Sequence, residues 1–347
     1  MQAILLVGGK GTRLRPLTNT TPKPMLPVAG VPFTAHQIAR ARDAGVTRIV
    51  LGTSYRPEVF AEYFGDGSDF GVELVYRTEE EPLGTGGGIR YAAEALTCGP
   101  DEPVLVFNGD VLSGVDLRHL VAEHETTGAA VTLYLTRVAD PRAFGLVPTD
   151  AEGRVTEFRE KPTTVQEIVT DQINAGCYVF RRDVIDRIPV GQVVSVERDT
   201  FPGLLAQGHR LTGVVDDGYW LDLGTPLSFV RGSADLVLGR VDSSAVPGPT
   251  GERLVLGDAR VSDDATVTGG SVVASVLMPG VVVAAGAAVR DSVLATGARV
   301  GEKASVSGTV VAEGAVIGAG VELVEGARVW PGAVIPDGGL RFSSDRS

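Results

Sequence analysis

Three consecutive blocks of 17 residues near the end of the chain match one another position by position, and this repeat constrains the fold most strongly. In the first block, aliphatic residues recur six positions apart at Leu277, Val283 and Val289. This spacing fits a triangular coil in which each side is one short strand with one side chain pointing inward. The repeat therefore predicts a parallel β-helix over residues 254–337, with a β-sandwich as the alternative. The aligned blocks are Ser275–Asp291, Ser292–Gly308 and Thr309–Glu325.

The preceding part of the chain follows a different pattern, in which short β-rich runs alternate with amphipathic segments. The runs Ala3–Val7 and Val104–Asn108 are candidates for buried strands, and Thr34–Ala44 is a candidate for a helix. Such alternation is typical of βαβ units, so we predict an α/β domain with a mainly parallel sheet. A segment rich in Pro, Gly and Ser predicts a linker. The predicted parts are a domain at 1–238, a linker at 239–253 and a β-helix domain with a C-terminal tail at 254–347.

The composition excludes several classes of function. The formal net charge of −12 disfavours binding to nucleic acid or to an anionic membrane. No apolar run approaches the roughly 18 residues that a membrane span requires, and Met1–Val7 lacks the marks of a secretory signal. Cys98 and Cys177 show no metal-binding or disulfide spacing. We therefore expect a cytoplasmic protein whose basic N-terminal cluster of Lys10, Arg13, Arg15 and Lys23 binds a small anion.

A glycine-rich loop follows the first predicted strand and is the strongest local signal. Its sequence fits neither the GxGxxG dinucleotide fingerprint nor the Walker pattern. Its successive backbone N–H groups could still cradle phosphate oxygens, while Arg13 neutralises their charge. Lys23 lies between two prolines that are expected to hold the backbone extended and to aim its ammonium group. The loop residues are Gly8, Gly9, Gly11, Thr12 and Arg13.

Two aspartates lie among apolar residues and are candidates for metal ligands. Asp110 ends the apolar run FNGD, and Asp222 lies within YWLDLGTP. A carboxylate in such surroundings is costly unless it binds a metal or accepts hydrogen bonds. If the two meet, they would give Mg²⁺ two hard oxygen ligands and leave positions for phosphate and water.

Two further segments could bind the remaining parts of a substrate. Lys161 could hold a second phosphate, while Glu160 and Asn174 could bind sugar hydroxyl groups. After the third predicted strand, either Glu79 or Glu81, beside Gly84, could accept the paired N–H donors of guanine, which adenine does not offer.

These motifs, in this order, resemble those of the sugar-1-phosphate nucleotidylyltransferases over residues 1–235. The motifs are GGKGTRLRPLT, TPKP, FNGD, FREKP, NAG and YWLDLGTP. LRPLT, EPLGTGG and SVERDTFP look most like the mannose-1-phosphate guanylyltransferases. The resemblance implies a Rossmann-like, mainly parallel mixed sheet followed by a left-handed parallel β-helix of hexapeptide type. Gly86 departs from the family's PLGTAG, which has alanine at this position.

The resemblance also implies a reaction and a set of roles. A nucleoside triphosphate, GTP in the first instance, and a sugar 1-phosphate, mannose 1-phosphate in the first instance, would give a nucleotide sugar and pyrophosphate with Mg²⁺. Arg13, Lys23, Asp110 and Asp222 would be catalytic, the two aspartates as metal ligands. Gly8, Gly9, Gly11, Thr12, Glu79, Glu81, Gly84 and Thr85 would bind the nucleotide, together with Arg13, Lys23 and Asp110. Gly145, Glu160, Lys161 and Asn174 would bind the sugar 1-phosphate.

Other interpretations remain open at this stage. The same reaction could use glucose 1-phosphate or a related sugar or cyclitol phosphate with ATP, UTP or dTTP. A non-catalytic regulatory subunit that binds nucleotide sugars is an alternative of another class, although all four predicted catalytic residues are present. An acyltransferase role for the β-helix is disfavoured because that segment holds no histidine. The exposed faces of a β-helix favour self-association, so we expect a homo-oligomer.

Overall fold

The computed structural model describes residues 1–9, 11–15, 17–19, 21–246, 253–256, 259–324 and 326–340, with only the backbone described at 253–256. The chain forms two compact units. The first comprises Met1–Gly9 and Gln37–Trp220, and the second comprises Lys10–His36 and Leu221–Ser347. Lys10 itself and residues 247–252 of the predicted linker lie outside the described residues. The predicted domain boundaries stay a prediction.

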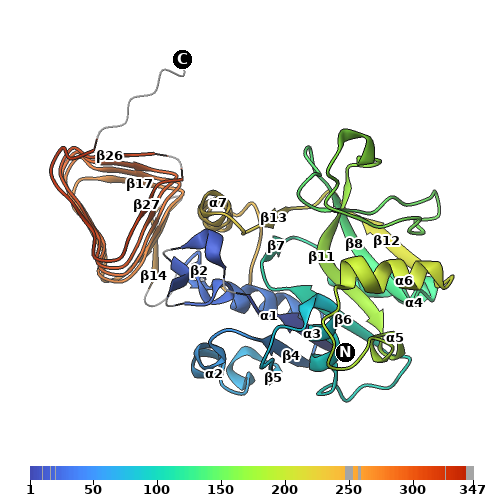
Figure 1. Cartoon of the computed structure of the whole chain (residues 1–347). Coiled ribbons are helices and arrows are strands. Elements are labelled where there is room, and N and C mark those ends of the chain that lie inside the picture. The colour runs from blue at the N-terminus through green and yellow to red at the C-terminus, as the bar shows by residue number, and fades with distance from the viewer. Residues whose placement is uncertain are drawn as a thin grey trace. The chain divides into compact units, whose positions relative to one another are not determined.

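The first unit is built on a nine-stranded mixed sheet with the order β10-β9-β11-β6-β1-β4-β5, and β8 pairs with both β11 and β12. Figure 1 labels β4, β5, β6, β8, β11 and β12 of this sheet. The central strand β1 runs parallel to β4 and β6, and β4 runs parallel to β5. β11 runs antiparallel to β6 and β8, which makes the sheet mixed, as expected. The strands are β1 (Gln2–Leu6), β4 (Arg48–Thr53), β5 (Glu73–Thr78), β6 (Pro103–Asn108), β8 (Val131–Arg137), β9 (Gly145–Leu146), β10 (Arg159–Glu160), β11 (Gln172–Arg181) and β12 (Leu211–Val215), with β7 (Val111–Ser113) directly after β6.

Aliphatic and aromatic side chains from the strands and from the helices beside them form the core of this unit. Ile4, Val106 and Tyr178 are fully buried in it, and Phe201 of α6 packs edge-on against Tyr178. No described helix is long and apolar enough to cross a membrane. The helices are α1 (Phe33–Asp43), whose first four residues belong to the second unit, α2 (Pro57–Phe64), α3 (Gly84–Ala93), α4 (Leu117–Thr127), α5 (Arg182–Asp186) and α6 (Phe201–Ala206), with the 3₁₀ turns η4 (Ser68–Phe70) and η5 (Val165–Glu167) and the short π-helix η6 (Val196–Thr200).

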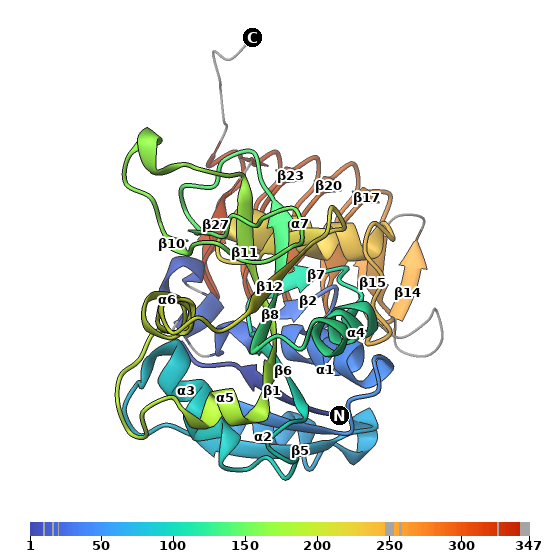
Figure 2. The same ribbon diagram turned by 90° about the vertical axis from the view of Figure 1, so that its right-hand side faces the viewer.

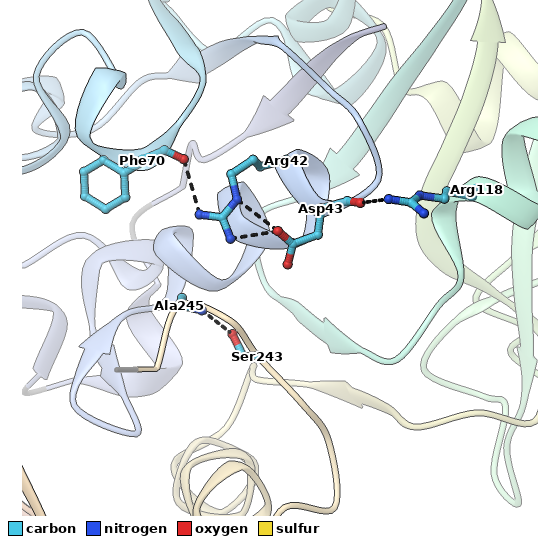
Figure 3. Close-up of polar contacts among 6 residues, drawn as sticks. All are labelled: Arg42, Asp43, Phe70, Arg118, Ser243 and Ala245. Carbon is cyan, nitrogen blue, oxygen red and sulfur yellow. Dashed lines mark hydrogen bonds and ion pairs between the residues drawn. The ribbon is translucent and has the colours of Figure 1, made fainter. Parts of the chain in front are cut away.

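Polar contacts fix the C-terminal end of α1, as Figure 3 shows. Arg42 donates to the Asp43 carboxylate at 2.7 and 2.9 Å and to the Phe70 carbonyl at 3.5 Å. The Asp43 carbonyl accepts from Arg118 at the start of α4. The contacts of Arg42 and Asp43 tie α1 to η4 and α4.

Figure 3 also shows a contact within the second unit, in which the Ser243 hydroxyl accepts from the Ala245 amide at 3.4 Å.

The second unit contains the segment after the first strand, one long helix and the C-terminal repeats. Its N-terminal segment holds three single-turn helices and a hairpin, and α7 begins at a capping box in which Thr225 accepts from the Ser228 amide at 3.1 Å. These elements are η1 (Thr12–Leu14), η2 (Leu17–Asn19), η3 (Lys23–Met25), β2 (Pro27–Val28), β3 (Val31–Pro32), β13 (Trp220–Asp222), whose first residue belongs to the first unit, and α7 (Pro226–Val237).

The repeats form a triangular coil of three parallel sheets, visible end-on in Figure 1 and from the side in Figure 2. Residues one block apart pair, as in Leu277 with Leu294 and Val283 with Val300, so the inward aliphatic positions stack into one buried core. This arrangement confirms the predicted β-helix and excludes the β-sandwich. The first strand of the region, β14 (Arg253–Leu256), runs antiparallel to β15, so the parallel coils begin at Ala259.

The strands of the β-helix are short and follow the three sides in turn. They are β15 (Ala259–Ser262), β16 (Thr266–Val267), β17 (Ser271–Val273), β18 (Val276–Leu277), β19 (Val282–Val283), β20 (Ala288–Arg290), β21 (Val293–Leu294), β22 (Arg299–Val300), β23 (Ser305–Ser307), β24 (Val310–Val311), β25 (Val316–Ile317), β26 (Glu322–Leu323), β27 (Arg328–Val329) and β28 (Val334–Ile335).

Candidate active site

The glycine loop begins directly after β1 at the carboxyl edge of the parallel strands. The Gly9 amide donates to the Ser54 hydroxyl at 3.4 Å, and Ser54 follows the neighbouring strand β4. Gly8 and Gly9 are both exposed, so a ligand can reach their backbone groups. This position matches the expectation that ligands gather beyond the carboxyl ends of parallel strands.

Gly11 joins the glycine loop to the segment that carries Lys23. Its φ of +54° lies in the left-handed region, and a Cβ at this position would lie 2.7 Å from the Lys23 Cβ. The Thr18 hydroxyl donates to the Gly11 carbonyl at 2.9 Å and closes the loop. Glycine is therefore required where the loop and the stem of Lys23 are in contact.

The backbone at Lys23 differs from the predicted extended form. Pro22 is extended with ψ of 142°, but Lys23, Pro24 and Met25 form a 3₁₀ turn, in which the Met25 amide donates to the Pro22 carbonyl at 2.8 Å. Pro24 fits this turn because the first N–H groups of a helix have no partner within the helix. The prolines thus fix Lys23 by starting a turn.

The side chains of Arg13 and Asp222 both lie close to Gly224. A Cβ built on Gly224 would lie 2.7 Å from Asp222 Oδ1 and 2.9 Å from Arg13 Nη2. Arg13 comes from η1 in the glycine loop, and Asp222 comes from the end of β13. The second unit therefore places a guanidinium group beside one of the two predicted metal ligands.

Asp110 lies in the turn that links β6 and β7. The preceding Gly109 amide donates to the Leu6 carbonyl at 2.8 Å, which fixes this turn to the end of β1. Gln37 of α1 donates to the Asn108 carbonyl at 2.8 Å and supports the turn from the other side. Since Asp110 and Asp222 belong to different units, their meeting at one ion stays a prediction.

The predicted sugar residues Gly145, Glu160 and Lys161 come together at the β9–β10 pair. Gly145 lies opposite Glu160 in this pair, and a Cβ on Gly145 would lie 2.7 Å from Glu160 Oε2. Lys161 has a left-handed φ of +50°, and its ammonium group lies 3.6 Å from Glu160 Oε1. The lysine is exposed, whereas Glu160 is largely buried.

Asn174 occupies an irregular part of β11. The register of β11 against β8 shifts between Asn174 and Tyr178. The Asn174 amide group donates to the Tyr178 hydroxyl at 2.8 Å, and its oxygen accepts from the Gly176 amide at 3.1 Å. Asn174 therefore stabilises the bulge, and its predicted contact with a sugar stays a prediction.

Glu197 is a carboxylate that the sequence analysis did not assign. It accepts from the Thr85 hydroxyl at 2.7 Å and from the Ser195 hydroxyl at 2.8 Å. Burial, and next the charge of Glu197, raises the pKa of Glu160. The two carboxylates therefore belong to one cluster. Glu197 lies in SVERDTFP, which carried the family resemblance but no assigned role.

The predicted base-binding segment packs against the loop before η6. The Gly86 and Gly87 amides donate to the Val194 carbonyl at 2.8 and 3.2 Å. A Cβ on Gly86 would lie 2.9 Å from Val194 Cγ1, which gives a physical reason for glycine where the family has alanine. The predicted residues Gly84 and Thr85 begin α3 in this segment.

The two glutamates proposed for guanine differ in their surroundings. The Glu79 carboxylate accepts from the Leu83 amide at 3.3 Å, just before α3, and burial raises its pKa. Glu81 is exposed. Glu79 therefore supports the start of α3, and the selection of guanine by either residue stays a prediction.

Comparison with known proteins assigns the family. The model of the family described as "Nucleotidyl transferase" matches residues 2–237, and the model described as "GlmU-like, C-terminal hexapeptide" matches residues 244–327. A mixed α/β sheet with a glycine loop at its carboxyl edge agrees with the first match. The chain belongs to the nucleotidyl transferase family and carries a hexapeptide-repeat region.

Two relatives within this family are described as mannose-1-phosphate guanylyltransferases. The chain is 56% identical over 359 residues to the mannose-1-phosphate guanylyltransferase of Mycobacterium tuberculosis, with 99% of this chain and 98% of that protein covered. It is 40% identical over 232 residues to the catalytic subunit beta of the Drosophila melanogaster enzyme of the same name, with 67% and 61% covered.

Two solved structures are similar in fold to about two thirds of this chain. One is described as a putative glucose-1-phosphate thymidylyltransferase from Bacillus anthracis, with 26% identity, a TM-score of 0.61, and 67% of this chain and 94% of that chain covered. The other is HddC from Yersinia pseudotuberculosis complexed with GMP-PN, with 25% identity, a TM-score of 0.57, and 68% and 99% covered.

Proposed function

We propose that this protein transfers the GMP group of GTP to mannose 1-phosphate and forms GDP-mannose and pyrophosphate. The observation that carries this proposal is the 56% identity, over nearly the whole of both chains, to a mannose-1-phosphate guanylyltransferase. The glycine loop after β1 and the guanidinium of Arg13 beside Asp222 supply the groups that such a transfer requires.

The reaction is an in-line displacement at the α-phosphorus of the nucleotide. A phosphate oxygen of mannose 1-phosphate forms the new P–O bond, and the bond to the β-phosphate oxygen breaks and releases pyrophosphate. This nucleophile is already ionised at neutral pH, so the protein needs no general base. Its contribution is to position the two substrates and to neutralise charge.

The N-terminal loop is proposed to bind the triphosphate. Backbone amides of Gly8, Gly9 and Gly11 would hold phosphate oxygens, as successive N–H groups in such loops do. Arg13 would contact the β- and γ-phosphates, and its planar fork suits their paired oxygens. Lys23, fixed by the η3 turn and the contact of its stem with Gly11, would contact the α-phosphate.

Asp110 and Asp222 are proposed to hold a divalent metal, Mg²⁺ in the first instance. Carboxylate oxygens are the hard ligands that Mg²⁺ prefers, and the ion commonly completes its shell with phosphate oxygens and water. When bound, the ion would supply neutralisation of phosphate charge.

The sugar phosphate is proposed to bind at the Glu160 cluster. The exposed ammonium of Lys161 would contact its phosphate, and Glu160 would accept from sugar hydroxyl groups. Glu197 adds a second carboxylate, held by Thr85 and Ser195, on the same cluster. This arrangement supports separate sites for the phosphates of the two substrates.

The compartment and the assembly state are also proposals. Cys98 and Cys177 are both free thiols, which agrees with a reducing compartment such as the cytoplasm. Self-association through the β-helix is proposed because stacked coils present extended faces.

Pyrophosphate release from the purified protein with Mg²⁺ tests the function. The assay pairs GTP, ATP, UTP, CTP and dTTP with the 1-phosphates of mannose, glucose and N-acetylglucosamine. We expect release with GTP and mannose 1-phosphate far above every other pair. Faster release with another pair would identify that pair as the substrates and leave the proposed mechanism unchanged. No release with any pair would favour the non-catalytic regulatory subunit.

A further inference from the structure

One outward column of the β-helix is buried within the second unit. The column contains Val276, Val293 and Val310, which are 1%, 3% and 2% exposed although they do not belong to the β-helix core. Helix α7 packs on this sheet at β15 and β18, and Figures 1 and 2 both show it beside the β-helix. This face is therefore an internal packing surface, with valine on three successive coils and the buried Arg260, which pairs with Val276, on the coil before them.

The last coil breaks this pattern. Val276, Val293 and Val310 are spaced by the 17-residue repeat, but the residue that pairs with Val310 on the next coil is Arg328, one position later than the repeat predicts. The column thus changes from a buried valine to an exposed arginine. A long cationic donor replaces an apolar side chain at the end of the packing surface.

Arg328 contacts the backbone of the glycine loop. Its Nη1 donates to the Arg15 carbonyl at 2.7 Å and to the Arg13 carbonyl at 3.1 Å. These carbonyls lie at the end of η1, where a short helix leaves its last C=O groups without partners of its own.

We propose that Arg328 is a positioning residue for the transferase reaction, because it holds the end of η1 and thereby orients the guanidinium of Arg13 beside Asp222. This inference rests on the proposed binding of GTP phosphates by Arg13. It gives the β-helix a direct part in nucleotide binding, through one side chain of β27, the strand at the end of its sheet.

The test compares Arg328→Ala and Arg328→Lys with the control Arg299→Ala. Arg299 is also an exposed arginine at the first position of a two-residue strand, but on another face of the β-helix. We expect Arg328→Ala to raise the KM for GTP by about tenfold and to leave the KM for mannose 1-phosphate unchanged. Arg328→Lys should restore part of the loss, since an ammonium group can donate to two carbonyls. Arg299→Ala should match the wild type.

A second readout follows η1 directly. The Leu14 amide donates to the Gly11 carbonyl and the Arg15 amide to the Thr12 carbonyl, so hydrogen exchange at these amides reports the order of η1. We expect exchange at both amides to be about tenfold faster in Arg328→Ala and unchanged in Arg299→Ala.

Three results would overturn the inference. The first is that Arg328→Ala has wild-type KM values and wild-type hydrogen exchange. The second is that Arg328→Ala raises the KM for both substrates equally and lowers the melting temperature. The third is that Arg299→Ala raises the KM for GTP as much as Arg328→Ala does. If the wild type releases no pyrophosphate from GTP and mannose 1-phosphate, the proposed function fails. The exchange measurement would still decide whether Arg328 orders η1.

Discussion

The backbone amide of Gly109 donates to the carbonyl of Leu6 across 2.8 Å, and a Cβ on Gly109 would lie only 2.3 Å from the same oxygen. The two residues belong to the ends of neighbouring parallel strands. Their contact brings Asp110 close to the origin of the glycine loop. The position of a predicted metal ligand thus depends on a residue that has no side chain.

We therefore expect Gly109→Ala to reduce both stability and activity. The added methyl group would collide with a backbone oxygen, which cannot move aside as a flexible side chain can. The expected cost is about 1–3 kcal/mol of unfolding free energy, with a fall in kcat because Asp110 moves. Urea unfolding and pyrophosphate release measure the two effects. Unchanged stability would show that the turn tolerates a side chain.

Gly224→Ala tests the placement of Arg13 beside Asp222. The new Cβ would lie under 3 Å from atoms of both side chains. We expect kcat to fall by about tenfold or more, with little change in stability, since both neighbours are side-chain ends. Gly203→Ala is the matched control, because its Cβ would meet nothing within 4 Å. Equal kinetics in the two variants would contradict the proposed role of this pair.

Asp110→Asn and Asp222→Asn test the proposed metal ligands. Each change keeps the shape of the side chain and removes its charge. We expect turnover to fall at least about a hundredfold while circular dichroism and melting stay close to the wild type. A titration of activity against Mg²⁺ should show a higher requirement in both variants. Full activity in either variant would show that the substituted aspartate is not a metal ligand.

Lys161→Ala separates the two phosphate sites. Its ammonium group is exposed and lies beside Glu160, so its removal should cost little stability. We expect the KM for mannose 1-phosphate to rise by about tenfold and the KM for GTP to change little. Steady-state kinetics with each substrate varied in turn gives both constants. The reverse result would exchange the assigned phosphate sites.

His124 predicts a pH dependence of stability. Burial, and next the charge of Arg181, lowers the pKa of His124 to about 4, and its ring accepts or donates in a contact of 3.0 Å with Thr132. In the unfolded chain His124 binds a proton below about pH 6.5, whereas in the folded protein it stays neutral down to about pH 4. The free energy of unfolding therefore falls as the pH is lowered from about 6.5 to about 4.

His124→Gln should therefore lose less stability between pH 7.5 and pH 5 than the wild type, by about 2 kcal/mol. Urea unfolding at the two pH values measures this difference for each protein. Comparing the change with pH, and not the absolute stability, removes the direct effect of the substitution on packing. Parallel losses in both proteins would show that His124 does not carry the effect.

Local regularity explains what could be predicted of the fold. The six-residue spacing determines the β-helix because each side of a coil offers one inward position, and the structure places Leu277, Val283 and Val289 there. The α/β sheet follows in the same way from alternating buried runs. The extended backbone predicted at Lys23 was wrong because prolines can start a turn as well as extend a chain.

The candidate site was less accessible to sequence reasoning, because its contacts join distant segments. Thr85 and Glu197 are 112 positions apart, and no spacing pattern relates them. Glu79 is an acid in a charged run, but the structure shows that it also supports the start of α3. Motifs identify residues that can perform chemistry, whereas the tertiary fold decides which neighbours each of them has.

The lengthened step from Val310 to Arg328 limits how this protein can change during evolution. Tandem repeats can be duplicated or lost as whole units. In this chain, each added coil would move Arg328 by about 4.8 Å, the distance between neighbouring strands, and would separate it from the carbonyls of Arg13 and Arg15. A change in the number of coils would therefore break the contact between Arg328 and the glycine loop, so selection for nucleotide binding would keep the number of coils constant.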